Sequence, residues 1–85
     1  ASIVAKYDSK VEFEELRTVD ITDENGNAAK MVVGRLAEVR FVDVNTDIVL
    51  FTQNVPYGST LYVNEGDKVE KGKLIAKWIR LTRLS

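Results

Sequence analysis

The sequence predicts a small all-β domain of the sandwich or barrel class, with about seven or eight short, mostly antiparallel strands. Turn signals recur roughly every eight to twelve residues, and apolar and polar side chains alternate between them. No stretch has the period of a helix. With 85 residues, one proline and no low-complexity tract, residues 1–85 fit a single domain. So short a chain buries only about 60% of its unfolded surface, so its fold depends on a well-packed core.

The N-terminal half supplies the first strands. Residues 2–6 lean apolar and fit an edge strand, and residues 11–14 alternate apolar and acidic side chains, as a strand with one face in water does. The β-branched residues 18–22 predict the next strand, and residues 28–33 its return strand. Between them, the Asn-Gly pair within residues 23–27 is typical of a tight hairpin turn with positive φ at both central residues.

The second half continues the pattern. Residues 35–43 alternate cleanly, with Ala, Val and Phe on one face. Residues 48–52 are almost continuously apolar, which predicts a strand buried on both faces. Residues 60–63 alternate again, residues 64–67 form a turn signal, and residues 74–78 form a closing strand.

Glycines and a proline punctuate this second half. Pro56 fixes its own φ and has no N–H, and Gly58 tolerates positive φ, so the Pro-Tyr-Gly segment predicts a turn. Between Gly66 and Gly72 stands one apolar residue, Val69, with charged residues on both sides. We expect Val69 to close one end of a small barrel. The alternative is a charged hairpin loop in which the valine is incidental.

Two motifs in this part of the chain resemble known families. Residues 66–75 have the pattern Gly-Asp-x-Val-x-x-Gly-x-x-Ile, which is similar to the half-motif of barrel-sandwich hybrid domains, Gly-Asp-x-Val-x-x-Gly-x-x-Leu/Ile. These domains include the biotinyl and lipoyl carriers. A closer resemblance comes from Val-Pro-Tyr-Gly-Ser-x-Leu at residues 55–61 and Leu-Ile-Ala-Lys-Trp at residues 74–78. Together they resemble the sandwich-barrel hybrid insertion domains of the bacterial DNA-directed RNA polymerase β′ subunit. The family commonly has Asp-Pro after the Trp, where this chain has Ile79-Arg80.

The resemblance implies a non-catalytic insertion module of a bacterial, cytoplasmic nucleotidyltransferase that carries out transcription. In that family the inserts lie between the two halves of the mobile trigger loop and contribute contacts or conformational control. The implied partners are the remainder of the β′ chain and the other polymerase subunits. The catalytic Mg²⁺ of the parent enzyme would be held by residues absent from this chain. The structural motif residues implied are Pro56, Tyr57, Gly58, Gly66, Val69, Gly72 and Trp78.

An insertion module is a piece of a longer polypeptide, and we expect this chain to be one. Its two ends should then lie close together and exposed, and it should fold without the parent. As an isolated domain we expect a monomer that makes no membrane contact, because no apolar run approaches the length of a membrane span.

The residue types needed for most catalytic sites are missing. The chain has no His and no Cys, which excludes His/Cys metal clusters and nucleophiles activated by His. The acidic turns at residues 20–24 and 43–47 lack the spacing of a calcium loop, and turn chemistry accounts for their side chains. Glu12 and Glu14 fall on one exposed strand face, which suits a solvated surface better than an acid–base pair. We therefore predict no catalytic, cofactor-binding or metal-binding residue.

The charge of the chain is unevenly distributed. Residues 1–64 carry six basic and ten acidic side chains, whereas residues 65–85 carry six basic and three acidic ones. Such asymmetry fits a basic face towards a phosphate backbone or an acidic partner, and it fits an ordinary solvated surface equally well. The candidate nucleic-acid or partner contacts, including a weak DNA contact, are Lys73, Lys77 and Arg80, with Tyr57, Tyr62 and Trp78 as nearby aromatics. The alternative role of the tryptophan is to fill the core or its rim.

A carrier domain, or another β-barrel binding module outside transcription, is the competing class. Biotinyl and lipoyl domains present a modified lysine at the tip of the hairpin that follows the Gly-x-x-Leu strand. Counted from Gly72 as in the biotinyl family, that position falls at Thr82. Neither Glu-Ala-Met-Lys-Met nor Asp-Lys-Ala occurs, and Lys77 falls inside the predicted closing strand. The carrier scaffold is present in outline, but its modification site is not.

Overall fold

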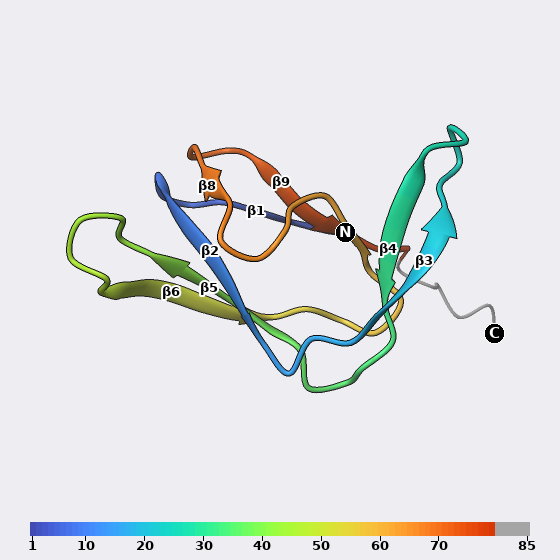
Figure 1. The fold of residues 1–85 in the computed structure, drawn as a ribbon, viewed down its shortest axis with the longest axis horizontal. Coiled ribbons are helices and arrows are strands. Elements are labelled where there is room, and N and C mark those ends of the chain that lie inside the picture. The colour runs from blue at the N-terminus through green and yellow to red at the C-terminus, as the bar shows by residue number, and fades with distance from the viewer. Residues whose placement is uncertain (80–85) are drawn as a thin grey trace, which may run out of the picture.

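The computed structural model describes residues 1–79, which form nine strands and no helix (Figure 1). The strands are β1 (Ser2–Val4), β2 (Ser9–Glu14), β3 (Thr18–Thr22), β4 (Ala28–Val32), β5 (Glu38–Val42), β6 (Val49–Asn54), β7 (Thr60–Leu61), β8 (Lys68–Val69) and β9 (Leu74–Lys77). They form a five-stranded sheet, β1-β9-β7-β4-β3, and a four-stranded sheet, β6-β5-β2-β8. All pairings are antiparallel. The predicted all-β, sandwich-like fold class is confirmed. None of the described residues belongs to a helix that could cross a bilayer.

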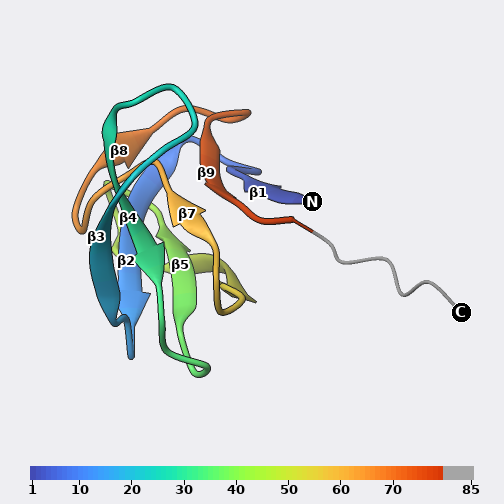
Figure 2. The same ribbon diagram turned by 90° about the vertical axis from the view of Figure 1, so that its right-hand side faces the viewer.

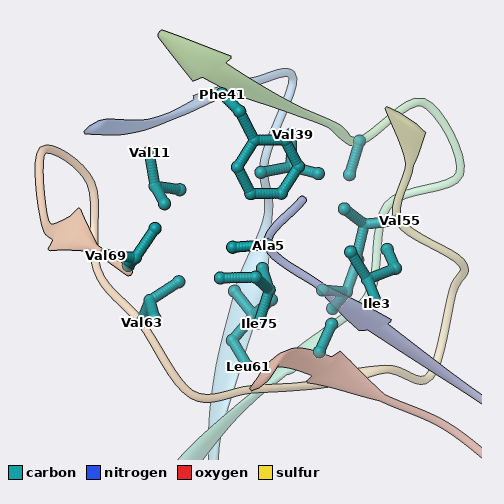
Figure 3. Close-up of a cluster of buried hydrophobic side chains, with 13 residues drawn as sticks. Ile3, Ala5, Val11, Val39, Phe41, Val55, Leu61, Val63, Val69 and Ile75 are labelled. Carbon is teal, nitrogen blue, oxygen red and sulfur yellow. The ribbon is translucent and has the colours of Figure 1, made fainter. Parts of the chain in front are cut away.

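The core lies between the two sheets. Phe41 and Val39 of β5 point inward, together with Val11 of β2, and from the other sheet they meet Ile3 of β1 and Ile75 of β9 (Figure 3). All five side chains are almost completely buried. Burying each such side chain stabilises the fold by about 1.5–3 kcal/mol. The alternation of Ala37, Val39 and Phe41 therefore marks the side of this segment that packs against the core, whereas Val42, which follows Phe41, is also buried.

The β3–β4 hairpin forms where the sequence predicts it, but its turn differs from the predicted one. A tight Asn-Gly turn needs positive φ at two residues, and only Gly26 has it, with φ of 82°. The N–H of Gly26 donates to the carbonyl of Asp23 at 3.0 Å, and the N–H of Asp23 donates to the carbonyl of Asn27 at 2.8 Å. The Asp23 carboxylate also accepts from the N–H groups of Asn25 and Asn27. These bonds hold a longer loop in which a single residue adopts the left-handed conformation.

The prediction of a strand buried on both faces at residues 48–52 is wrong. β6 is the outermost strand of the four-stranded sheet, and Val49 and Leu50 are 47% and 37% exposed. Only the next apolar residue, Phe51, packs against the core, with its ring centre 6.4 Å from that of Phe41. An unbroken apolar run records hydrophobicity but not the number of neighbouring strands.

The two ends of the described chain lie side by side. β1 and β9 are neighbours in the five-stranded sheet, with Ser2 opposite Lys77 (Figure 2). Beyond them, the amino group of Ala1 donates to the carbonyl of Trp78 at 3.2 Å, and the N–H of Trp78 donates to the carbonyl of Ala1 at 3.0 Å. The chain therefore enters and leaves the described fold at one place.

Candidate interaction surface

The Pro-Tyr-Gly segment forms a turn that presents a tyrosine. The carbonyl of Pro56 accepts hydrogen bonds from the Ser59 N–H at 3.1 Å and from the Ser59 hydroxyl at 2.6 Å. The Ser59 side chain is fully buried, and the second bond satisfies its hydroxyl. Gly58 has φ of 88°, the left-handed value that this turn requires. Tyr57 is 55% exposed, and the Arg35 guanidinium lies 5.3 Å from its ring centre. These hydrogen bonds hold the turn, and the aromatic ring at its tip is accessible to a partner.

The segment between Gly66 and Gly72 lies against the core. Val69 is only 8% exposed and contacts the core cluster near Val11 and Val63 (Figure 3). At its two ends the N–H of Gly66 donates to the carbonyl of Val11 at 2.8 Å, and that of Gly72 donates to the carbonyl of Ala5 at 2.7 Å. The charged residues around Val69 face solvent, so this segment closes one end of the core through a single apolar side chain.

The candidate contact lysines border two different hollows on the surface. Lys77, Tyr62 and Trp78 line a hollow of about 380 Å³. Lys73 lines a second hollow of about 520 Å³, which Tyr62 also borders. The third candidate, Arg80, lies outside the described residues. The geometry thus gathers one lysine and two aromatic residues, not the whole predicted set.

The charge of the first hollow does not favour phosphate. Two carboxylates, Asp23 and Glu24 of the β3–β4 turn, line it together with Lys77, so its described charged residues carry a net negative charge. Trp78 also packs against the core cluster, which agrees with the alternative role of rim filling. A nucleic-acid contact at Lys73, Lys77 and Arg80 therefore remains a prediction.

The carboxylates of β2 lie on the outer face of the four-stranded sheet. Arg40 Nη1 lies 2.8 Å from Glu14 Oε1, and Lys10 Nζ lies 3.5 Å from Glu12 Oε2. These side chains are partly exposed, and such pairs contribute only about 0–1 kcal/mol each. Over residues 1–79, no three acidic, His or Cys side chains are grouped as metal ligands would be. The arrangement is that of a solvated sheet face.

One carboxylate has a perturbed pKa, for a reason unrelated to catalysis. Asp43 Oδ2 accepts hydrogen bonds from the Thr46 hydroxyl at 2.8 Å and from the Thr46 N–H at 2.9 Å. Together with a weaker bond from the Asn45 N–H at 3.2 Å, these bonds stabilise the ionised form and lower the pKa of Asp43. The carboxylate organises the β5–β6 turn, and it does not line the hollows that Lys73 and Lys77 border.

The lysine nearest to the carrier motif is not at a hairpin tip. Lys77 lies within β9, with Ser2 opposite it on one side and Thr60 on the other. A cofactor attached there would not have the reach that a swinging arm gains from a projecting turn. The position expected from the biotinyl motif, Thr82, lies outside the described residues.

Sequence reasoning missed the exposed edge of β6. Residues 48–55 contain no charged side chain, yet they provide the longest of the sheet edges in the described chain. The absence of charge over eight consecutive residues was the available signal. The same run also predicts burial, because a buried strand and an apolar edge strand have the same composition.

Comparison with known proteins identifies the relatives of this chain. No family model matches it. The chain is 81% identical over 78 residues to the DNA-directed RNA polymerase subunit β′ of Bacteroides thetaiotaomicron. The matched region covers 92% of this chain and 6% of that subunit. The β′ subunit of Porphyromonas cangingivalis is 58% identical over 69 residues, which is 81% of this chain. That of Flavobacterium johnsoniae is 46% identical over 78 residues, which is 92% of this chain. The chain spans only about 5–6% of the length of these relatives. These matches confirm the predicted resemblance.

Proposed function

The chain is homologous to a short segment of the bacterial DNA-directed RNA polymerase β′ subunit, and we propose that it serves there as a non-catalytic insertion module. In this role it contributes to transcription through contacts or conformational control near the trigger loop, as the resemblance of its motifs implies. It works in the bacterial cytoplasm, where its partners are the remainder of the β′ chain and the other polymerase subunits.

The observation that carries this proposal is the pairing of the two ends. Ala1 and Trp78 exchange two backbone hydrogen bonds although 77 positions separate them in the sequence. A domain whose ends are adjacent can be inserted into a loop of a host without forcing the ends of that loop apart. The small fraction of each relative that the chain spans supports the same conclusion.

The side-chain chemistry supports a role other than catalysis. The chain has no His and no Cys, and the carboxylates of β2 are paired with cations on an open sheet face. The carboxylate with a lowered pKa, that of Asp43, accepts hydrogen bonds from Thr46 within its own turn. In this proposal, residues of β′ outside the chain hold the Mg²⁺ of the polymerase and the module supplies no ligand.

Deletion of the module within full-length β′ tests the proposal. Residues 2–77 are replaced by a short Gly-Ser linker, which suffices because Ser2 and Lys77 are neighbours. Assembly of the polymerase, promoter binding, single-nucleotide addition and pausing are then measured. We expect assembly and promoter binding to persist and bond formation to continue, with altered rates of addition or pausing.

Two outcomes would contradict the proposal. An assembled enzyme that no longer adds a single nucleotide would show that the module is needed for chemistry. Addition and pausing identical to those of the wild-type enzyme on every template would show that it exerts no control. Replacement of the module by an unrelated small β domain with adjacent ends is the matched control, because it restores bulk without these surfaces.

A further inference from the structure

The strand β6 leaves one row of its backbone groups without a strand partner. The N–H of Val55 donates to the carbonyl of Ala37 at 2.9 Å, and Gln53 and Phe51 are the next residues that pair with β5 in the same alternation. In an antiparallel pair, alternate residues direct both their N–H and C=O groups to the same side. Thr52 and Asn54 therefore direct theirs away from β5, towards the open edge of the sheet (Figure 1).

This edge lacks the features that normally prevent a strand from joining it. Proteins protect edges by keeping them short or by placing charges, prolines or bulges on them. The other edges in the described chain follow that rule. β1 has three residues, β8 has two, and β3 carries Asp20, which is paired with Lys30 at 2.9 Å. β6 has six residues with neither charge nor proline, and its register shift lies at its first residues only.

The side chains at the start of the open edge are apolar and accessible, whereas Thr52, Gln53 and Asn54 are polar. Ile48, Val49 and Leu50 follow one another along the chain and are 60%, 47% and 37% exposed. An added strand would hydrogen-bond to the free backbone groups and cover these side chains, which is how peptides are recognised by strand addition. β6 itself carries no charged side chain, and the Lys6 ammonium lies over the Phe51 ring, 4.3 Å from its centre. The complementary strand is therefore one whose apolar side chains cover Ile48, Val49 and Leu50.

We propose that β6 accepts an additional strand from an extended, apolar segment of the same β′ subunit, which extends the four-stranded sheet. This inference rests on the proposed function, since it requires the module to be embedded in β′. The relatives carry more than nine-tenths of their length outside the region matched by this chain. A segment of the same chain is held near the edge by its covalent connection, whereas a separate chain has to reach the edge by diffusion.

The test uses the assembled polymerase with a photo-crosslinking amino acid, p-benzoylphenylalanine, in place of Leu50. We expect crosslinks to one extended segment of β′. A Thr52→Pro substitution removes the outward N–H but no bond to β5, so the fold is retained while crosslinking falls by at least about fivefold. The matched control, Thr52→Val, keeps the N–H and a similar shape, and its crosslinking should equal that of the parent.

Amide hydrogen exchange gives a second, independent measure. The amides of Thr52 and Asn54 should exchange at least about tenfold more slowly in the polymerase than in the 85-residue chain. Unchanged protection of Phe51 and Gln53 shows that β6 is intact in the Thr52→Pro variant. If β6 is not intact in that variant, Thr52→Lys is used in its place, because a charge on the edge opposes pairing with an apolar strand.

Several outcomes would overturn the inference. The first is a crosslink to another subunit, to a second copy of the module or to nucleic acid. The second is a crosslink yield no higher than that from a probe at Val19 on the β3 edge. The third is unprotected amide exchange at Thr52 and Asn54 in the polymerase. The deletion experiment tests the insertion itself, so the edge proposal can fail while the proposed function stands.

Discussion

The backbone N–H of Phe13 donates a hydrogen bond to Oε1 of Glu65 at 2.8 Å, across 52 positions of sequence. β8 pairs with β2 only at Ser9 and Lys10, and the N–H of Val11 then donates to the carbonyl of Asp67 at 2.9 Å. Beyond that point, the carboxylate of Glu65 takes the place of a backbone carbonyl. The ladder along β2 is thus extended by a side chain.

Glu65→Ala should lower the free energy of unfolding of the chain by about 0.5–1.5 kcal/mol, because the N–H of Phe13 loses its acceptor. Glu65→Gln keeps an acceptor oxygen and should cost less. Glu70→Ala is the control, since Glu70 is an exposed residue of the same segment. Urea unfolding followed by the fluorescence of Trp78, the one tryptophan of the chain, measures all three variants. A glutamine variant as unstable as the alanine variant would show that the bond does not stabilise the edge.

Val69→Ala should destabilise the chain by about 1–3 kcal/mol, because it leaves a void between Val11 and Val63 at the end of the core. The neighbouring Lys68→Ala should change stability by less than about 0.5 kcal/mol, since the lysine is exposed. The measurement is again urea unfolding. If both substitutions change the free energy of unfolding by equally small amounts, the segment is a charged loop in which the valine is incidental.

Gly58→Ala should cost about 1–2 kcal/mol, because the backbone φ of 88° at this turn is unfavourable for a residue with a Cβ. Gly34→Ala is the matched control. Its Cβ would lie 3.6 Å from Arg17 Cβ and 3.6 Å from the Glu15 carbonyl oxygen, which are ordinary contacts, and its φ is not left-handed. We expect a change below about 1 kcal/mol there. The Gly58→Ala variant should melt at a lower temperature than the Gly34→Ala variant. The reverse order would contradict the turn geometry.

The Asp43 carboxyl should titrate below its usual pKa of about 3.9, because hydrogen bonds from Thr46 and Asn45 stabilise the ionised form. Its contribution to stability is complete above the unfolded pKa and is lost as the pH falls through the lower folded pKa. In Asp43→Asn, the stability should therefore show a weaker dependence on pH in that acidic range. Carboxyl NMR gives the pKa directly, and urea unfolding across the range gives the linkage. A midpoint at or above the usual value would contradict the assignment.

Local signals predicted the parts of the fold that depend on neighbours in sequence. The alternation in β5 identified Val39 and Phe41 as core residues, and the polar residues 23–27 identified the β3–β4 turn. The detailed form of that turn was not predictable from the Asn-Gly pair, because the Asp23 carboxylate competes for its N–H groups. The hydrogen bond from Phe13 to Glu65 left no trace in the sequence.

The same division applies to the candidate surfaces. The motifs of residues 55–78 pointed to the correct relatives, since a motif is a property of sequence. Which lysines share a hollow with Tyr62, and which residues of β6 face an open edge, depend on strand order. Strand order is set by contacts between residues far apart in the chain.

The sequence by itself determined the class of the fold, the positions of most strands and turns, and the absence of His and Cys. Those features follow from backbone preferences and side-chain chemistry that act over a few residues. Only the tertiary structure decided that β6 lies at an edge and that Ala1 meets Trp78. Both depend on which strands pair across the sheets, and burial of the shared core selects that pairing for the whole chain at once.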